Sequence, residues 1–364
     1  MGEPTLVAEA HTDVPFTAPP STTGTKHVGG LDTVRLVAAL AVVFGHIGFV
    51  PIFGPAGSND FVVKAARAVY YNAIPGPAAV IVFFVVSGFC IHYPYRDGAR
   101  IPYLSYYARR YVRILVPMAA AIVLGNAVGV QLTLLTDSIL WSLVCEEIYY
   151  LIYPLLRRLG SRFGFRRVIL VSYVLSLVVF ATDPRAGNYP SYGVGLNWIL
   201  GLPVWLAGCE LAEIVSKPQP VPTRTAIWAW RLGVWGAAFV ASVLRFHSPL
   251  KYPLTLNLFG FLAALWLVRE ISYRRAFPAP PLLERGGRWS YSIYLVHLQA
   301  VALFGLLGLP DLGRYTNWFL LTTFVLVGCY LFARLIEFPS HRFARLVGAR
   351  LLAMDGPKAM AATR

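Results

Sequence analysis

An arginine and a histidine stand in one apolar stretch near the start of the chain, residues 31–49. Arg35 precedes His46 by eleven residues, which on an α-helix is about three turns and roughly 16 Å of rise. The two side chains would then lie on nearly the same face. If the helix enters the membrane near Asp32, His46 lies well inside a hydrocarbon layer about 30 Å thick. A titratable group at that depth indicates function, because bare hydrocarbon does not tolerate it cheaply.

The pair suggests a cation for an anionic ligand at the inner surface and a base deeper in the helix. Neutral imidazole is a good general base because its unperturbed pKa, about 6.5, lies near working pH. Each residue alone also has a purely structural interpretation. Arg35 could anchor the helix at the headgroups, and His46 could form a helix–helix hydrogen bond.

Two adjacent carboxylates, Glu146 and Glu147, stand inside another apolar stretch, where they are costly unless partnered. Adjacent residues point about 100° apart on a helix, so at most one should face a cavity with His46. That carboxylate would orient and charge-stabilise the imidazole. We favour Glu147, and Glu146 and a salt link to Arg231 stay open. Ser142 could be a covalent nucleophile or a packing hydroxyl.

The composition is that of a polytopic helical membrane protein. The chain has 364 residues, 57% of them hydrophobic and 13% charged, with a mean hydropathy of +0.59, whereas globular proteins are about a quarter charged. The four cysteines fall inside apolar runs and are expected to be small buried hydrophobes, not a disulfide framework or a metal site. We predict an all-α fold and no metal.

Ten transmembrane helices are expected, with boundaries good to a few residues. The predicted spans are about 31–52, 73–93, 112–131, 137–156, 166–182, 194–215, 225–245, 253–272, 289–309 and 315–337. Most Lys and Arg residues then fall on one side, which predicts that both termini are cytoplasmic in a multi-pass protein of the cell membrane. This topology accounts for most of the formal charge of +15, so no nucleic-acid partner is expected.

The predicted organisation is one membrane domain between two tails. Residues 1–28 are rich in Thr, Pro, Ala and Ser and lack an apolar core, so we expect a disordered tail and not a signal peptide. The membrane domain covers 29–348, and 349–364 form a basic tail. Within the domain, Ser87 and Gly88 are expected to allow close helix packing.

Several stretches together resemble the membrane-bound acyltransferase 3 family. They are LDTVRLVAALAVVFGH (31–46), FFVVSGFCI (83–91), WSLVCEEIYYLIYPLL (141–156), YSIYLVH (291–297) and RLIEFPSHR (334–342). They occur in the family's order and cover about residues 29–346. The resemblance implies transfer of an acyl group from cytoplasmic acyl-CoA, the co-substrate, to a hydroxyl of a sugar, glycolipid or glycoside. It also implies that His46 and Arg35 are essential, and that Arg110 and Arg113 match a basic RxxR element.

Physical chemistry supports that division of roles. Arg35, Arg109, Arg110 and Arg113 are expected at the inner surface, where guanidinium groups suit the phosphates of CoA. Ordinary positive-inside charge is the competing interpretation of the last three.

A further set of residues is expected to line the acceptor site or the cavity: Ser142, Tyr150, Tyr291 and His297. For His297, a hydrogen-bonded core histidine is the competing interpretation.

The expected mechanism is direct transfer, in which His46 takes the proton of the acceptor hydroxyl. A covalent acyl-enzyme is a variant that the sequence does not separate. The alternative function is a proton-coupled transporter in which His46 and Glu147 form a proton relay. The acyl chain, the acceptor, the side on which it binds and the oligomeric state stay open, and membrane lipids and a second copy of the chain are possible partners.

Overall fold

The computed structural model describes residues 28–53, 60–132 and 138–354, and every regular element in these ranges is a helix. The predicted all-α class is therefore confirmed. The predicted tail at 1–28 lies almost entirely outside the described residues.

Thirteen α-helices and three short helical segments make up the described chain. The α-helices are α1 (Leu31–Ile47), α2 (Phe61–Asn72), α3 (Gly76–His92), α4 (Tyr103–Ala127), α5 (Trp141–Phe163), α6 (Phe165–Thr182), α7 (Asn197–Ser216), α8 (Arg224–His247), α9 (Tyr252–Ala276), α10 (Pro281–Gly287), α11 (Ser290–Leu306), α12 (Arg314–Phe332) and α13 (Phe338–Met354). The short segments are η1 (Tyr93–Tyr95), η2 (Pro190–Tyr192) and the π-helix η3 (Ala333–Glu337).

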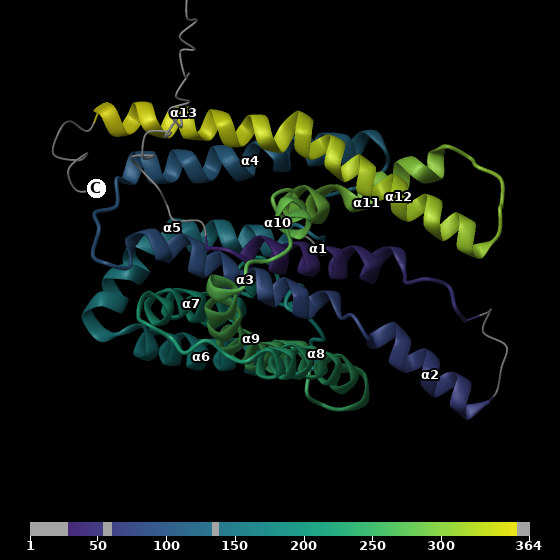
Figure 1. The fold of residues 1–364 in the computed structure, drawn as a ribbon, viewed down its shortest axis with the longest axis horizontal. Helices are drawn as coiled ribbons and strands as arrows, with labels where there is room; N and C mark the ends of the chain where they lie inside the picture. The colour runs from purple at the N-terminus through teal and green to yellow at the C-terminus, as the bar shows by residue number, and fades with distance from the viewer. Residues whose placement is uncertain (1–27, 54–59, 133–137, 355–364) are drawn as a thin grey trace, which may run out of the picture.

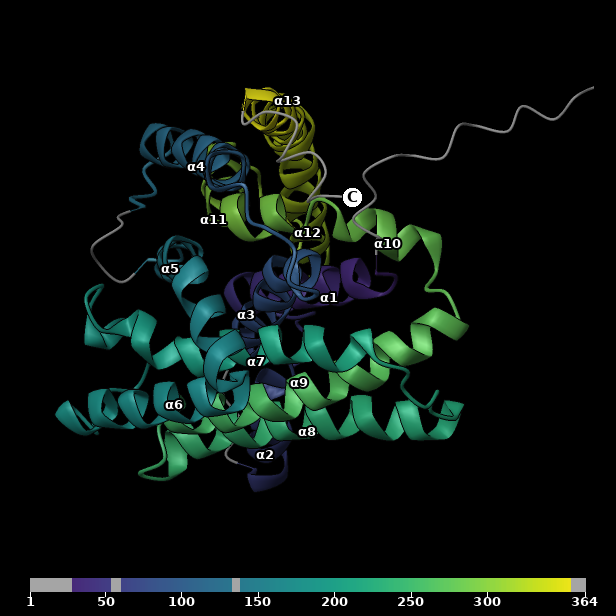
Figure 2. The same ribbon diagram turned by 90° about the vertical axis from the view of Figure 1, so that its left-hand side faces the viewer.

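The helices form two groups with α1 and α3 between them. Figures 1 and 2 show α4, α11, α12 and α13 on one side of α1 and α3, and α6, α7, α8 and α9 on the other. Close approach of α3 to α7 depends on glycine: a Cβ at Gly88 would lie 1.9 Å from the backbone oxygen of Trp205, and one at Gly208 would lie 2.1 Å from that of Val85. The predicted close packing at Gly88 is confirmed.

Among the described residues, seven helices are long and apolar enough to cross a membrane, or eight if the bent pair α10–α11 is one span. A polytopic membrane protein is thus supported, while the count of ten and the orientation of the termini stay predictions. α1 has only 17 residues, and about 20 are needed to span the hydrocarbon. α5 interrupts its apolar sequence with Glu146 and Glu147.

Two predicted span boundaries differ from the helix ends in ways that affect the site. α1 ends at Ile47 and not near 52, because Gly48 turns the chain with a φ of 81°. His46 therefore lies in the last turn of its helix. α4 begins at Tyr103 instead of 112. α13 runs to Met354 and so includes the first residues of the segment 349–364, which stays a predicted basic tail.

Candidate active site

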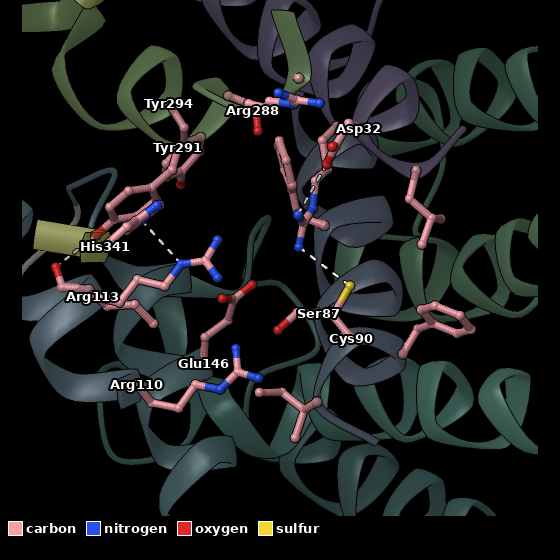
Figure 3. Close-up of a pocket in the computed structure, with 18 of the residues that line it drawn as sticks. Asp32, Ser87, Cys90, Arg110, Arg113, Glu146, Arg288, Tyr291, Tyr294 and His341 are labelled. Carbon is pink, nitrogen blue, oxygen red and sulfur yellow. Dashed lines mark hydrogen bonds and ion pairs between the residues drawn. The ribbon is translucent and has the colours of Figure 1, made fainter. Parts of the chain in front are cut away.

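A cavity of about 800 Å³ opens among α1, α3, α4, α5, α11 and α13, and Figure 3 shows many of the side chains that line it. Basic side chains outnumber acidic ones on its wall. The basic ones are Arg35, Arg110, Arg113, Arg288, His341, Arg342 and Arg345. The acidic ones are Asp32, Glu146 and Glu337. The wall thus favours an anionic occupant.

Arg35 reaches the cavity from the second turn of α1. Its Nη1 lies 3.6 Å from the Asp32 Oδ1, and its Nη2 lies 3.5 Å from the Cys90 Sγ of α3. The side chain is 27% exposed. Arg35 is thus held between α1 and α3 and lines the cavity.

Two of the three arginines of α4 line the cavity. Arg110 and Arg113 line the cavity, as expected for residues three apart on one helix. Arg109 is not among the lining residues. It packs on α13 instead, where a Cβ at Gly348 would lie 2.2 Å from its Nε. The Arg113 Nε donates to the Nε2 of His341 over 3.1 Å, which ties α4 to α13 beside the cavity.

Of the two adjacent carboxylates, Glu146 faces the cavity and Glu147 does not line it. Tyr150 donates its hydroxyl to the Glu146 Oε2 over 2.6 Å, and the Ser87 hydroxyl lies 2.7 Å from that of Tyr150. Both carboxylate oxygens of Glu147 are buried without a hydrogen-bond partner among the described residues. The alternative salt link to Arg231 is wrong, because Arg231 binds Glu270 through two bonds of 2.9 and 2.7 Å.

Ser142 and Tyr291, two further residues predicted to line the cavity, do line it. The Tyr294 hydroxyl donates to the carbonyl of Ile139 over 2.7 Å, so the Ser142 hydroxyl, 2.8 Å away, donates to Tyr294. No base contacts Ser142 among the described residues, which gives no support to a nucleophilic role. Tyr291 donates to the carbonyl of Ile114 over 3.0 Å.

His46 and His297 form a pair beyond the cavity. The Nδ1 of His46 lies 3.0 Å from the Nε2 of His297 and 3.0 Å from the carbonyl oxygen of Val42. His297 is fully buried and His46 is exposed. Neither lines the cavity, but Tyr294, which does, precedes His297 by less than one turn. The described residues supply no carboxylate hydrogen bond to His46.

One continuous helix still links the two ends of the site. Arg35 and His46 both lie on α1, so eleven residues at 100° each bring them to within about 20° of one face. The ring of Tyr294 meets that of Phe83 edge to face, with centroids 6.0 Å apart. Both rings line the cavity, and His297 follows Tyr294 by three residues on α11.

The second half of the chain adds cations to which the sequence assigned no ligand role. Gly287 lets α10 approach α1, because a Cβ there would lie 1.8 Å from the backbone oxygen of Asp32. The helix axis then bends by 63° between α10 and α11, and Arg288 sits in the bend. Arg342 and Arg345 come from α13. The positive-inside rule explains such residues equally well, so the sequence held no separate signal for them.

Comparison with known proteins gives the family. Residues 28–334 match the model of the acyltransferase 3 family, described as an acyltransferase domain. The chain belongs to this family. It is also 24% identical over 329 residues to the acyltransferase MdmB of Streptomyces mycarofaciens, covering 79% of this chain and 82% of that protein. No solved structure matches the chain significantly. The family predicted from the motifs is confirmed, and the protein is a membrane acyltransferase.

Proposed function

We propose that this acyltransferase moves an acyl group from acyl-CoA to a hydroxyl of a sugar, glycolipid or glycoside. The observation that carries the proposal is the gathering of cations on one cavity wall: six arginines and His341 against three carboxylates. Family membership supports acyl transfer in general. The donor, the acceptor and the roles of individual residues are our proposal.

The CoA phosphates bind in the basic cavity. Guanidinium groups bind phosphate oxygens through paired, charge-assisted hydrogen bonds. Arg35, Arg110 and Arg113 approach from two helices, so they can contact the pyrophosphate and the 3′-phosphate from different sides. Glu146 lies between the guanidinium groups of Arg110 and Arg113 in Figure 3. Its negative charge offsets the repulsion between these two cations before the donor enters.

The acyl end of the donor extends along α1 toward His46. The rise of roughly 16 Å between Arg35 and His46 is comparable to the reach of an extended pantetheine arm. The Phe83 and Tyr294 rings lie at the side of the cavity that the arm must pass. In our proposal these two side chains move aside when the donor binds.

His46 then acts as the general base. The acceptor oxygen attacks the thioester carbonyl carbon while its proton moves to the imidazole, the C–S bond breaks, and the CoA thiolate takes up the proton. The acceptor approaches from the side on which His46 is exposed.

The test uses purified protein in detergent, labelled acetyl-CoA and an extract of cell-envelope lipids and glycans. We expect label in the extract with wild-type protein and none with His46→Ala, which should still bind CoA. Near-normal transfer by His46→Ala would refute the base role. Transfer in detergent, where no ion gradient exists, also separates the enzyme from a proton-coupled transporter.

A further inference from the structure

His297 is the nearest polar partner of the proposed base. The two rings belong to different helices, α1 and α11, and their centroids lie 4.9 Å apart. A neutral imidazole has one N–H donor and one acceptor nitrogen, and the atoms around each nitrogen decide which is which. The contacts of this pair allow the protons to be assigned.

The assignment starts at the buried ring. The Nδ1 of His297 lies 3.1 Å from the carbonyl oxygen of Ile293 and 2.8 Å from that of Tyr294. Carbonyl oxygens only accept, so this Nδ1 carries the proton. In the neutral ring the Nε2 is then an acceptor, and the Nδ1 of His46, 3.0 Å away, must donate to it.

The second contact of His46 agrees with this assignment. Its Nδ1 also lies 3.0 Å from the carbonyl oxygen of Val42, another group that only accepts. A proton on Nδ1 satisfies both neighbours, whereas a lone pair there would face the carbonyl oxygen. The lone pair of His46 is therefore on Nε2, the nitrogen that a general base needs free.

We propose that His297 is the positioning residue of this acyltransferase: it fixes the tautomer and the ring orientation of His46. The inference rests on the proposed function, in which His46 is the base. It assigns to a neutral imidazole the role that sequence reasoning gave to Glu147 or Glu146.

Burial makes His297 suited to that role. Its ring is fully buried and bonded to the backbone of its own helix. His46 is exposed and stands in the last turn of α1, two residues before Gly48. Without His297, the Val42 carbonyl would be its one described hydrogen-bond partner, and the ring could turn to present either nitrogen.

The bond to His297 gains strength during the reaction. When the acceptor oxygen attacks, its proton moves to the Nε2 of His46, and the Nδ1 proton stays in place. The ring is then a cation, so its Nδ1–H donates a charge-assisted hydrogen bond to His297. The Nε2 proton next passes to the sulfur of the departing CoA thiolate, and both rings return to their starting state.

Two substitutions of similar size separate positioning from packing. His297→Gln keeps an acceptor oxygen near the place of Nε2, and His297→Leu keeps bulk without one. With purified protein, acetyl-CoA and the envelope extract, we expect His297→Leu to lower kcat by about 10- to 100-fold. The KM for acetyl-CoA should stay unchanged, because His297 does not line the cavity. His297→Gln should recover most of kcat.

A buried histidine elsewhere supplies the control. His92 bonds to Glu213 and Tyr153 and does not line the cavity. A similar kcat loss in His92→Leu, or equal losses in His297→Leu and His297→Gln, would show a packing role and overturn the proposal. Wild-type kcat in His297→Leu, with His46→Ala inactive, would overturn it and leave the base role standing. Full activity of His46→Ala would refute the proposed function itself.

Discussion

The sharpest prediction compares two neighbouring arginines of α4. Arg113 lines the cavity, whereas Arg109 packs against Gly348 of α13. Arg113→Gln and Arg109→Gln remove the same charge from the same helix, four residues apart. If the cavity binds the phosphates of CoA, only the first change should weaken donor binding strongly.

The structure allows the size of the effect to be worked out. A guanidinium group has five N–H donors, and Arg113 uses one for His341, which leaves four for a phosphate. Hydrogen bonds to charged groups contribute about 1.5–3 kcal/mol. Since each 1.36 kcal/mol is tenfold in affinity, we expect the Kd for CoA to rise about 10- to 150-fold in Arg113→Gln. For Arg109→Gln we expect a change of less than about threefold, as for an exposed charge outside the site.

The assay is calorimetric titration of CoA into purified protein, at two salt concentrations, since phosphate binding should weaken as salt screens the charges. Thermal unfolding of each variant shows whether it is folded. Equal losses of affinity in the two variants would refute the placement of the phosphates, because they would reflect only overall charge. Unchanged affinity in Arg113→Gln, with lost affinity in Arg109→Gln, would place the donor elsewhere.

Three more predictions follow from particular contacts. Cys90 is the one described cysteine that is not fully buried, and it lines the cavity. N-ethylmaleimide should therefore modify Cys90 before the other cysteines, and bound CoA should slow that modification. Equal modification rates with and without CoA, measured by mass spectrometry, would contradict the binding site. Gly88→Ala should destabilise the protein by about 3 kcal/mol, the upper end for overpacking, because its Cβ would meet the backbone of α7; an unchanged unfolding midpoint would disprove the close contact. Glu270→Gln should lower the free energy of unfolding by about 3–5 kcal/mol, because it leaves two partly buried arginines, Arg231 and Arg274, without their shared carboxylate. A much smaller decrease in the same unfolding experiment would show that water already screens these arginines.

Helical geometry is the part of the site that the sequence could predict. The common face of Arg35 and His46 depends only on an unbroken helix between them, and α1 supplies it. The all-α fold follows equally from composition. The family followed from motifs that fall in the right order, although the motifs alone carried no information on the shape of the cavity.

The rotation of each helix could not be predicted, because tertiary contacts decide it. Whether Glu146 or Glu147 faces the cavity depends on how α5 packs against its neighbours. In the structure Glu146 faces the cavity, and there it accepts a hydrogen bond from Tyr150. The same holds for α4, where Arg110 lines the cavity and Arg109 packs against Gly348 of α13.

The sequence did contain a signal that could have identified the partner of His46. A polar side chain among apolar helices needs a hydrogen-bond partner, and His297 stands in a similar apolar stretch near the other end of the chain. Pairing one imidazole with the other satisfies both. The prediction of a carboxylate partner rests on hydrolytic triads, which use one, and that analogy contains no information about the packing of these helices.

The most direct test of the account is an electron cryomicroscopy map of the protein bound to a stable ketone analogue of acetyl-CoA, in which CH₂ replaces the sulfur. We predict density for the phosphates against Arg35, Arg110 and Arg113, with the carbonyl carbon of the analogue beside the Nε2 of His46. Phosphates bound away from these arginines, or an acyl end that points away from His46, would contradict it.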